Sequence, residues 1–211
     1  MKKVWLIICL FLFIPGVFAE TKADLAPNSK SAILLDFDTG KILYSKNASE
    51  VLPPASMTKI MSMLLIMERI DNKTLSLTDE VTISENAASM GGSQVFLQAG
   101  ETYKVEELLK GIAIASGNDA VVAMAEKVSG SVSDFVALMN EKAKSLGLTN
   151  TKFLNPHGLD TEGHVTTARD MAIIARELIK HTSILKFTSI YEDYLKKSDG
   201  SSIWLVNTNK L

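Results

Sequence analysis

The strongest constraint on the fold is a helical segment, starting at Ser56 and running to Ile70, that has almost no polar face. Its apolar residues are Met57, Ile60, Met61, Met63, Leu64, Leu65, Ile66, Met67 and Ile70. A helix that is apolar on all sides is a buried helix, and methionine is typical of core filling. The sequence therefore predicts that other elements of the domain pack around residues 56–70.

The spacing of apolar residues predicts four further helices. In one of them apolar side chains recur at steps of three and four positions, as one helix face requires. Thr167 with Asp170 resembles a capping box at the start of the helix expected over residues 168–180. The expected helices span residues 103–116, 118–128, a segment capped by Ser133 that ends at Gly147, and 168–180.

Short strands are expected on either side of this helical region. Residues 32–36 and 41–45 have the composition of strands, and Asp38-Thr39-Gly40 between them supplies a turn with a glycine available for positive φ. The tail, residues 187–211, contains strand-like pieces, residues 202–206 among them. Helices in the middle with strands flanking them indicate an α+β fold.

The first 19 residues are predicted to be a secretory signal peptide. Two lysines precede an apolar run, residues 4–14, and small residues suited to cleavage lead up to Ala19. A membrane anchor is the alternative, but the run is shorter than the ~20 residues that span a bilayer, and Pro15-Gly16 breaks it. We therefore expect an exported protein that works in the periplasm or at the outer face of the cytoplasmic membrane.

Charge and cysteine content exclude several classes of protein. The chain has 211 residues, a formal net charge of −2 and one cysteine, Cys9, inside the predicted signal peptide. This charge balance gives no electrostatic footprint for nucleic acid, and one cysteine cannot form an internal disulfide or a thiolate metal cluster. A cysteine-free remainder suits an oxidising compartment. Residues 20–30 are expected to be a flexible lead-in, and residues 31–211 a single domain.

Candidate chemistry begins at the first turn of the buried helix, where Ser56 and Lys59 lie three positions apart. Residues at this spacing share a helix face and are ~4.5 Å apart along the axis. Burial disfavours a charged amine, so the pKa of Lys59 should fall toward that of a usable base. A serine beside a neutral amine is an activated nucleophile. Taken alone, this common pattern is better explained by a serine cap followed by a lysine that reaches solvent.

A second cluster, Ser116-Gly117-Asn118, falls at the expected junction between two helices. A short turn that carries a hydroxyl and a carboxamide can direct both into a cleft beside the first pair. From such a turn Ser116 could relay a proton, and Asn118 could position Lys59 and a substrate amide, although the triplet taken alone is better explained as a pair of helix caps. Serine, glycine and asparagine are also common at helix ends for structural reasons alone.

Together the two clusters match an active-site serine signature, Ser-x-x-Lys followed by Ser-x-Asn. The chain resembles the low-molecular-mass penicillin-binding proteins, the serine-type D-alanyl-D-alanine carboxypeptidases of peptidase family S11. The resemblance runs from about Ser31 to the last residue and implies a β-lactamase/transpeptidase-like fold, a helical cluster with an antiparallel sheet. It rests on the segments Pro53–Lys59, Gly91–Ser93, Ser116–Ala120, Asn155–Leu159, His164–Ala172 and Asn207–Leu211.

The resemblance implies a role for each candidate residue. Ser56 is expected to attack the bond between the two terminal D-alanines of a peptidoglycan pentapeptide and form an acyl-enzyme, with Lys59 as general base. Ser116 would shuttle a proton and Asn118 would orient the substrate, while the backbone N–H of Ser56 would form half of the oxyanion hole. Penicillins and other β-lactams are expected to trap the same serine. The resemblance implies no metal and no cofactor.

The third motif of the family, Lys-Thr-Gly, does not occur in this sequence. In relatives it follows soon after the segment matched by residues 207–211. We therefore expect an incomplete catalytic domain that lacks the later sheet strands, the smaller β-rich domain and the amphipathic membrane anchor of the family. On this expectation the 211-residue chain is inactive or nearly so, its hairpin 32–45 lacks sheet partners, and membrane association depends on absent segments.

Two other functions fit part of the pattern. A serine β-lactamase shares the first motif and the fold, but its usual second motif has aspartate where this chain has Gly117, and no Glu-x-x-Leu-Asn deacylation segment is evident. The other is a non-catalytic remnant of the fold with at most a binding role. The resemblance implies structural roles for His157 and His164, which lie in its Asn-Pro-His-Gly and His-x-Thr-Thr-Ala segments, and no carboxylate–histidine spacing matches a metal site. Gly91-Gly92-Ser93 is expected to form a loop beside the cleft, since no phosphate-binding lysine follows it.

Overall fold

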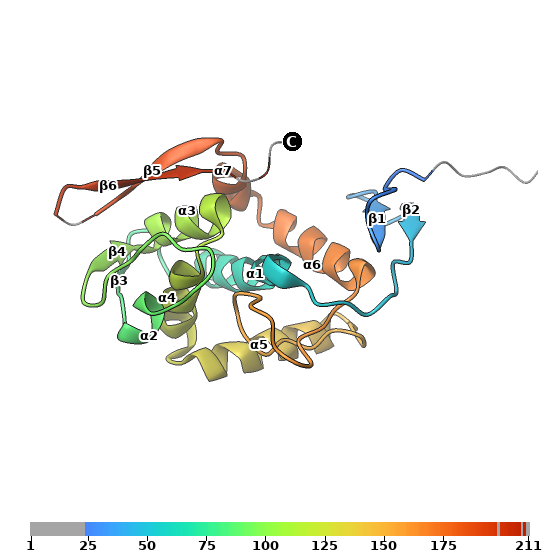
Figure 1. Cartoon of the computed structure of the whole chain (residues 1–211), viewed down its shortest axis with the longest axis horizontal. Coiled ribbons are helices and arrows are strands. Elements are labelled where there is room, and N and C mark those ends of the chain that lie inside the picture. Colours follow the sequence, from blue (N-terminus) through green and yellow to red (C-terminus); the bar gives the residue numbers. More distant parts are fainter. Residues whose placement is uncertain (1–23, 198, 208, 210–211) are drawn as a thin grey trace, which may run out of the picture.

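The computed structural model describes residues 24–197, 199–207 and 209, so the predicted signal peptide lies outside the described residues. Helices form most of the domain, and short antiparallel strand pairs lie around them (Figure 1). The elements in chain order are β1 (Ala32–Leu35), β2 (Ile42–Lys46), the 3₁₀ turn η1 (Ala55–Met57), α1 (Thr58–Asp71), β3 (Glu80–Thr82), α2 (Glu85–Ala88), β4 (Thr102–Lys104), α3 (Val105–Ala115), α4 (Asn118–Ser129), α5 (Val132–Ser145), α6 (Ala168–Lys180), η2 (Thr182–Ile184), α7 (Leu185–Thr188), β5 (Glu192–Lys196) and β6 (Ser202–Val206).

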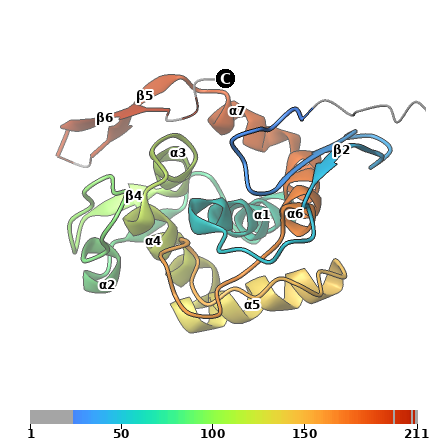
Figure 2. The same ribbon diagram turned by 45° about the vertical axis from the view of Figure 1, so that its right-hand side comes forward.

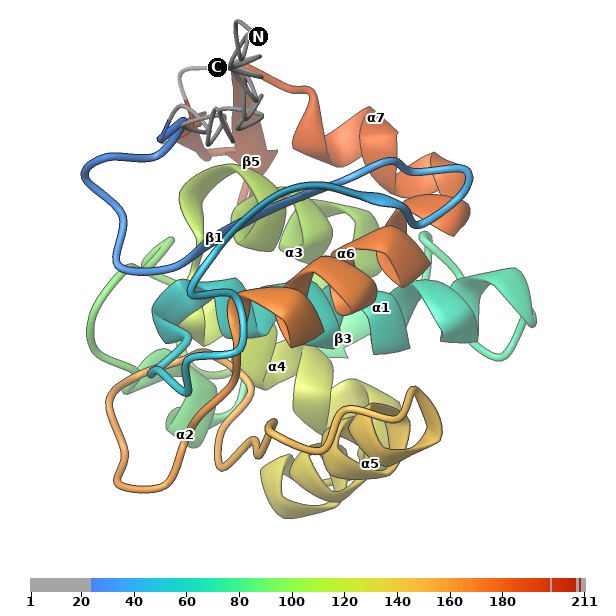
Figure 3. The same cartoon turned by 90° about the vertical axis from the view of Figure 1, so that its right-hand side faces the viewer.

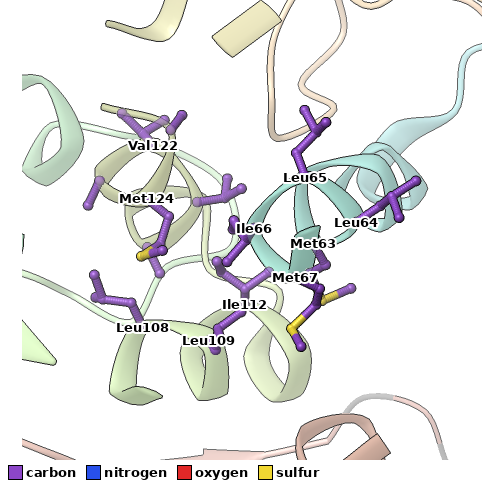
Figure 4. Packing of buried hydrophobic residues seen from close by; sticks show 14 of the residues in the cluster. Met63, Leu64, Leu65, Ile66, Met67, Leu108, Leu109, Ile112, Val122 and Met124 are labelled. Atoms are coloured by element: carbon purple, nitrogen blue, oxygen red, sulfur yellow. The ribbon is translucent and has the colours of Figure 1, made fainter. Parts of the chain in front are cut away.

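Helix α1 lies at the centre of the helical cluster, as its apolar sequence predicted. It contacts α4, α5 and α6, and these helices surround it in two perpendicular views (Figures 1 and 3). Every residue from Met61 to Met67 is buried. Ile112 of α3 lies beside Ile66 and Met67 of this stretch, and Leu108 of α3 lies beside Met124 of α4 (Figure 4). The expected buried helix is therefore the core of the domain.

Three helix starts differ from the sequence prediction. Ser56 lies in the 3₁₀ turn η1, and α1 begins at Thr58. Tyr103 belongs to β4, and α3 begins at Val105, because Lys104 adopts an extended conformation and residues 102–104 pair with residues 80–82. Ser131 rather than Ser133 caps α5, since the Ser131 side chain accepts a hydrogen bond from the backbone N–H of Asp134 at 3.0 Å. Helix α6 and its Thr167 cap were predicted correctly, with the Thr167 hydroxyl accepting from the N–H of Asp170.

The predicted hairpin of β1 and β2 is present and forms a two-stranded sheet within the described part of the chain. Its turn is fastened to α6 by Arg176, whose guanidinium donates to the carbonyl oxygens of Phe37 at 2.6 Å and Asp38 at 2.8 Å. Gly40, at φ +71°, lies so close to that guanidinium that a side chain there would contact it. The hairpin is thus attached to the helical cluster through its turn.

A second hairpin, β5 with β6, covers α3 on the side of the domain away from α5 (Figure 2). Leu195 and Leu205 on its inner face are buried, whereas Tyr194 and Trp204 face outward as a cross-strand pair. Strand β6 agrees with the expected strand at residues 202–206. Within the described residues no helix combines the length and hydrophobicity needed to cross a bilayer.

Candidate active site

Ser56 lies in η1, the 3₁₀ turn that leads directly into α1, and its side chain is exposed. The preceding residue, Ala55, has a positive φ of 49°, a conformation that costs a non-glycine residue about 1 kcal/mol. The turn packs tightly against Gly158, where an added Cβ would come within 1.8 Å of the Ala55 carbonyl oxygen. Backbone packing therefore holds this serine at the start of the central helix, where N–H groups of the first turn have no helical partners.

Lys59 is one turn further along α1 and is 2% exposed. Its Nζ donates to Ser56 Oγ at 3.3 Å and to the carbonyl oxygen of His157 at 2.8 Å. Burial lowers the pKa of Lys59 to about 8, and the negative charge of Asp119 partly opposes that effect. A substantial neutral fraction near pH 8 gives this amine a lone pair that can accept the serine proton. The predicted Ser56–Lys59 contact is therefore present, with the expected direction of the pKa shift.

Ser116 and Asn118 lie at the junction of α3 and α4, as the sequence indicated. Ser116 has a left-handed backbone, φ 56°, and its hydroxyl makes no hydrogen bond within the described residues. Asn118 is 2% exposed, and its Nδ2 donates to the Gly91 carbonyl oxygen at 2.7 Å. Its Oδ1 is buried without a partner among the described residues. The expected contact between Asn118 and Lys59 is not among the hydrogen bonds of the described chain.

Asp119 is a buried residue beside the site that the sequence reasoning did not identify. It is 1% exposed, and its carboxylate accepts from the backbone N–H groups of Val95, Leu97 and Ala120 at 2.9 to 3.1 Å. These bonds fasten the loop that contains Gly91 and Gly92 to the start of α4. The only sequence signal was its place directly after the Ser-x-Asn cluster, because its partners Val95 and Leu97 are distant in sequence.

The Gly91-Gly92 segment lies beside Asn118, as expected for a loop next to the cleft. Gly92 has φ +79°, and a Cβ there would lie 2.7 Å from Asn118 Nδ2 and 3.2 Å from the Leu159 side chain. Only glycine fits this close approach without displacing a neighbour. Gly91 and Gly92 thus connect the asparagine to the loop that carries His157.

His157 and His164 occupy a loop that packs on the first turn of α1. His164 Nε2 lies 2.8 Å from Thr58 Oγ1, and its Nδ1 accepts from the Leu154 N–H at 3.0 Å. Burial lowers the pKa of His157 to about 4, helped by the charge of Lys59, and burial also lowers the pKa of His164. Both rings are therefore neutral near pH 7. No three metal-ligating side chains cluster in the described chain.

Comparison with known proteins identifies the family of this chain. A profile of the peptidase S11 family, D-alanyl-D-alanine carboxypeptidase, matches residues 18–211. D-alanyl-D-alanine carboxypeptidase DacF of Bacillus subtilis is 58% identical over 208 residues, covering 97% of this chain and 54% of DacF. The chain spans about half the length of the curated relatives it matches.

Solved structures agree with this match. The D-alanyl-D-alanine carboxypeptidase DacD from Francisella tularensis superimposes with a TM-score of 0.81 at 36% identity, covering 86% of this chain and 44% of that one. Penicillin binding protein 5 from Haemophilus influenzae gives a TM-score of 0.78 at 34% identity, covering 85% and 52%. The expected penicillin-binding fold is therefore confirmed.

Proposed function

The chain belongs to the D-alanyl-D-alanine carboxypeptidases of peptidase family S11, and we propose that it acts as a serine-type carboxypeptidase on peptidoglycan stem peptides. The substrate would be a pentapeptide ending in two D-alanines, and the product the shortened peptide and free D-alanine. The observation that carries this proposal is the hydrogen bond between Lys59 Nζ and Ser56 Oγ at the start of a buried helix.

In the proposed first step, neutral Lys59 removes the Ser56 hydroxyl proton while Oγ forms a bond to the carbonyl carbon of the penultimate D-alanine. The carbonyl oxygen becomes an oxyanion that the backbone N–H of Ser56 can stabilise. Collapse of this intermediate breaks the C–N bond, and the proton passes to the leaving amine of the terminal D-alanine. Water then hydrolyses the ester and releases the shortened peptide.

Ser116 and Asn118 have free polar atoms suited to the roles proposed for them. The Ser116 hydroxyl, which has no hydrogen-bond partner among the described residues, can relay the proton between Lys59 and the leaving amine. The buried Oδ1 of Asn118 can accept a hydrogen bond from an N–H of the substrate or from Lys59. Asn118 Nδ2, which donates to Gly91, would have to exchange that bond to reach a substrate carbonyl.

A β-lactam ring presents a strained amide to the same serine, so β-lactams are proposed as covalent inhibitors. Serine β-lactamase activity is the competing enzymatic function, and a binding role without catalysis is the non-enzymatic one. We further propose that residues 1–19 direct export and that residues 31–211 act outside the cytoplasm on the cell wall. Cell-wall-acting relatives support this location.

Two measurements made in parallel distinguish these functions: release of D-alanine, and the labelling by and loss of a fluorescent penicillin. Both use the complete gene product, including any residues that the gene encodes after Leu211. The proposal expects D-alanine release from a pentapeptide, and covalent labelling by a fluorescent penicillin that is lost only slowly. Ser56→Ala should abolish both the release and the labelling. The matched control is Ser133→Ala, which removes an exposed serine from the first turn of α5, where no lysine lies one turn later. Rapid penicillin turnover without D-alanine release would indicate a β-lactamase. The absence of both penicillin labelling and D-alanine release would contradict an enzymatic role.

A further inference from the structure

We propose that His164 is a positioning residue for Lys59, acting through Thr58 and the loop that follows Leu154 to hold the amine beside Ser56. The importance of this positioning for catalysis rests on the proposed function. The positioning itself is a property of the folded chain, and it is measurable without any substrate.

The hydrogen bonds of the His164 ring fix its tautomer. Because Nδ1 accepts the Leu154 N–H, the ring proton must reside on Nε2. Nε2 then donates to Thr58 Oγ1 at 2.8 Å. The ring is 3% exposed and packs edge-on against Phe153. A protonated ring would place an N–H against the Leu154 N–H, so this pair of bonds requires neutral imidazole.

Thr58 is the first residue of α1, fully buried between the proposed nucleophile and its base. Two more residues near the start of α1, Lys59 and Ser62, bind the loop. Ser62 Oγ donates to the Pro156 carbonyl oxygen at 2.7 Å, and Lys59 Nζ donates to the His157 carbonyl oxygen at 2.8 Å. We call the contacts of Thr58, Lys59 and Ser62 with the loop the α1 latch. Of the three, only the His164 contact is made by a side chain of the loop.

The loop has little freedom to move independently of the latch. Asn155 Oδ1 accepts from the N–H groups of His157 and Gly158, which fixes the turn that presents the His157 carbonyl. Gly158 packs against the Ala55 carbonyl so closely that no side chain fits. A displacement of the loop at His164 would therefore move the acceptor of Lys59 and the support behind the serine turn together.

The surroundings of Lys59 make this acceptor important. Within the described residues its Nζ has two hydrogen-bond partners, Ser56 Oγ and the His157 carbonyl oxygen. The charged and titratable groups that face it are Asp119 of α4 and the neutral ring of His157, and Asp160 faces His164. If the loop loosens, water reaches Nζ, the desolvation that lowers the pKa is reduced, and the amine loses the bond that directs it.

The experiment is an NMR titration of Lys59 in protein labelled with ¹³C-lysine, its signal assigned by its loss in Lys59→Met. Wild type should titrate with a midpoint near 8. His164→Phe, which keeps a ring but removes both hydrogen bonds, should raise that midpoint by about one pH unit or more toward the usual value. Thr58→Val, which removes the hydroxyl from the helix side, should do the same. Thr58→Ser restores the hydroxyl and should return the midpoint to the wild-type value.

Thr151→Val is the matched control. Thr151 hydrogen-bonds Thr166 and Asp170 at the base of the same loop and makes no hydrogen bond to α1. Loss of the Thr151 hydroxyl should lower thermal stability and leave the midpoint of the Lys59 titration unchanged. If His164 were merely structural, His164→Phe would behave like this control, and that result would overturn the proposal. If His164→Phe does not fold, the Thr58→Val midpoint decides alone. Penicillin labelling of wild type separately tests the proposed function.

Discussion

Lys59 is an amine placed where its charged form is unfavourable. It is 2% exposed, and burial lowers its pKa to about 8 from 10.5 although the negative charge of Asp119 acts in the opposite direction. The unfavourable burial of this amine occurs three residues after the exposed Ser56, to which its Nζ donates a hydrogen bond. Two measurements at the residue scale depend on that shift.

The first is the pH dependence of acylation. Only the neutral amine can take the Ser56 proton, and the neutral fraction increases as the pH passes upward through the pKa. The rate constant for labelling by a fluorescent penicillin should therefore rise from pH 6 to a plateau above a midpoint near 8. Lys59→Arg, which stays charged, should lose the rise and at least about a hundredfold in rate. A wild-type rate constant that does not change between pH 6 and 9 would contradict the role of Lys59.

The second is the pH dependence of stability. Between the folded and unfolded pKa values of Lys59 the unfolded chain binds the extra proton, so the stability of wild type rises with pH across that window. Lys59→Met removes this term. Relative to wild type, the free energy of unfolding of the variant should fall by about 2 kcal/mol between pH 7.5 and 10. Urea unfolding at the two pH values measures the difference, and an unchanged difference would exclude a buried, shifted lysine.

At the scale of elements, the site consists of the first turn of α1 and the loops that pack on it. The loop of residues 154–164 supports η1 from one side, and the loop fastened by Asp119 lies beside Asn118. Both contain a glycine at positive φ in close backbone contact with the site, Gly158 and Gly92. The two loops therefore place their backbones where side chains would otherwise block the packing.

Gly158→Ala tests this packing. The variant combines a positive φ of 91° with a Cβ only 1.8 Å from the Ala55 carbonyl oxygen. We expect a loss of stability above about 2 kcal/mol and a strong decrease in penicillin labelling. Gly147→Ala is the matched control, because it also has a positive φ, 74°, but no atom near the new Cβ. It should lose about 1 kcal/mol and keep the labelling rate. Equal effects of the two variants would show that backbone strain alone matters.

The start of α5 provides a second test at this scale. Ser131 accepts the Asp134 N–H, whereas Ser133 lies inside the first turn and is exposed. Ser131→Ala should lower the free energy of unfolding by about 1 kcal/mol and Ser133→Ala by much less. Thermal unfolding of the two single variants gives the comparison. The opposite order would restore Ser133 as the cap.

At the scale of the whole molecule, the sequence predicted the parts of the fold that local patterns determine. The apolar stretch from Met61 to Met67 required a central helix, and the Thr167 cap located the start of α6. Strands β3 and β4 were not predicted, because each has three residues and they meet only through tertiary pairing. The same pairing moved Tyr103 from the predicted helix into a strand.

The predictability of the site follows the same division. Ser56 and Lys59 lie three residues apart where η1 leads into α1, so local spacing together with the Ser-x-Asn cluster and the family resemblance predicted their contact. Asp119 was missed because the backbone groups that surround it come from residues 95–97. The bond from Asn118 to Gly91 is likewise long-range. The roles of Ser116 and Asn118 remain predictions that act through this tertiary arrangement.

The central claim is that Ser56 is a nucleophile activated by Lys59, and its most direct test is mass spectrometry after reaction with penicillin. The protein as its gene encodes it is incubated with the drug at pH 8, digested, and the modified peptide sequenced. The account predicts one penicilloyl adduct on Ser56, absent in Ser56→Ala and strongly reduced in Lys59→Met. An adduct on another residue, an undiminished adduct in either variant, or no adduct in wild type would contradict it.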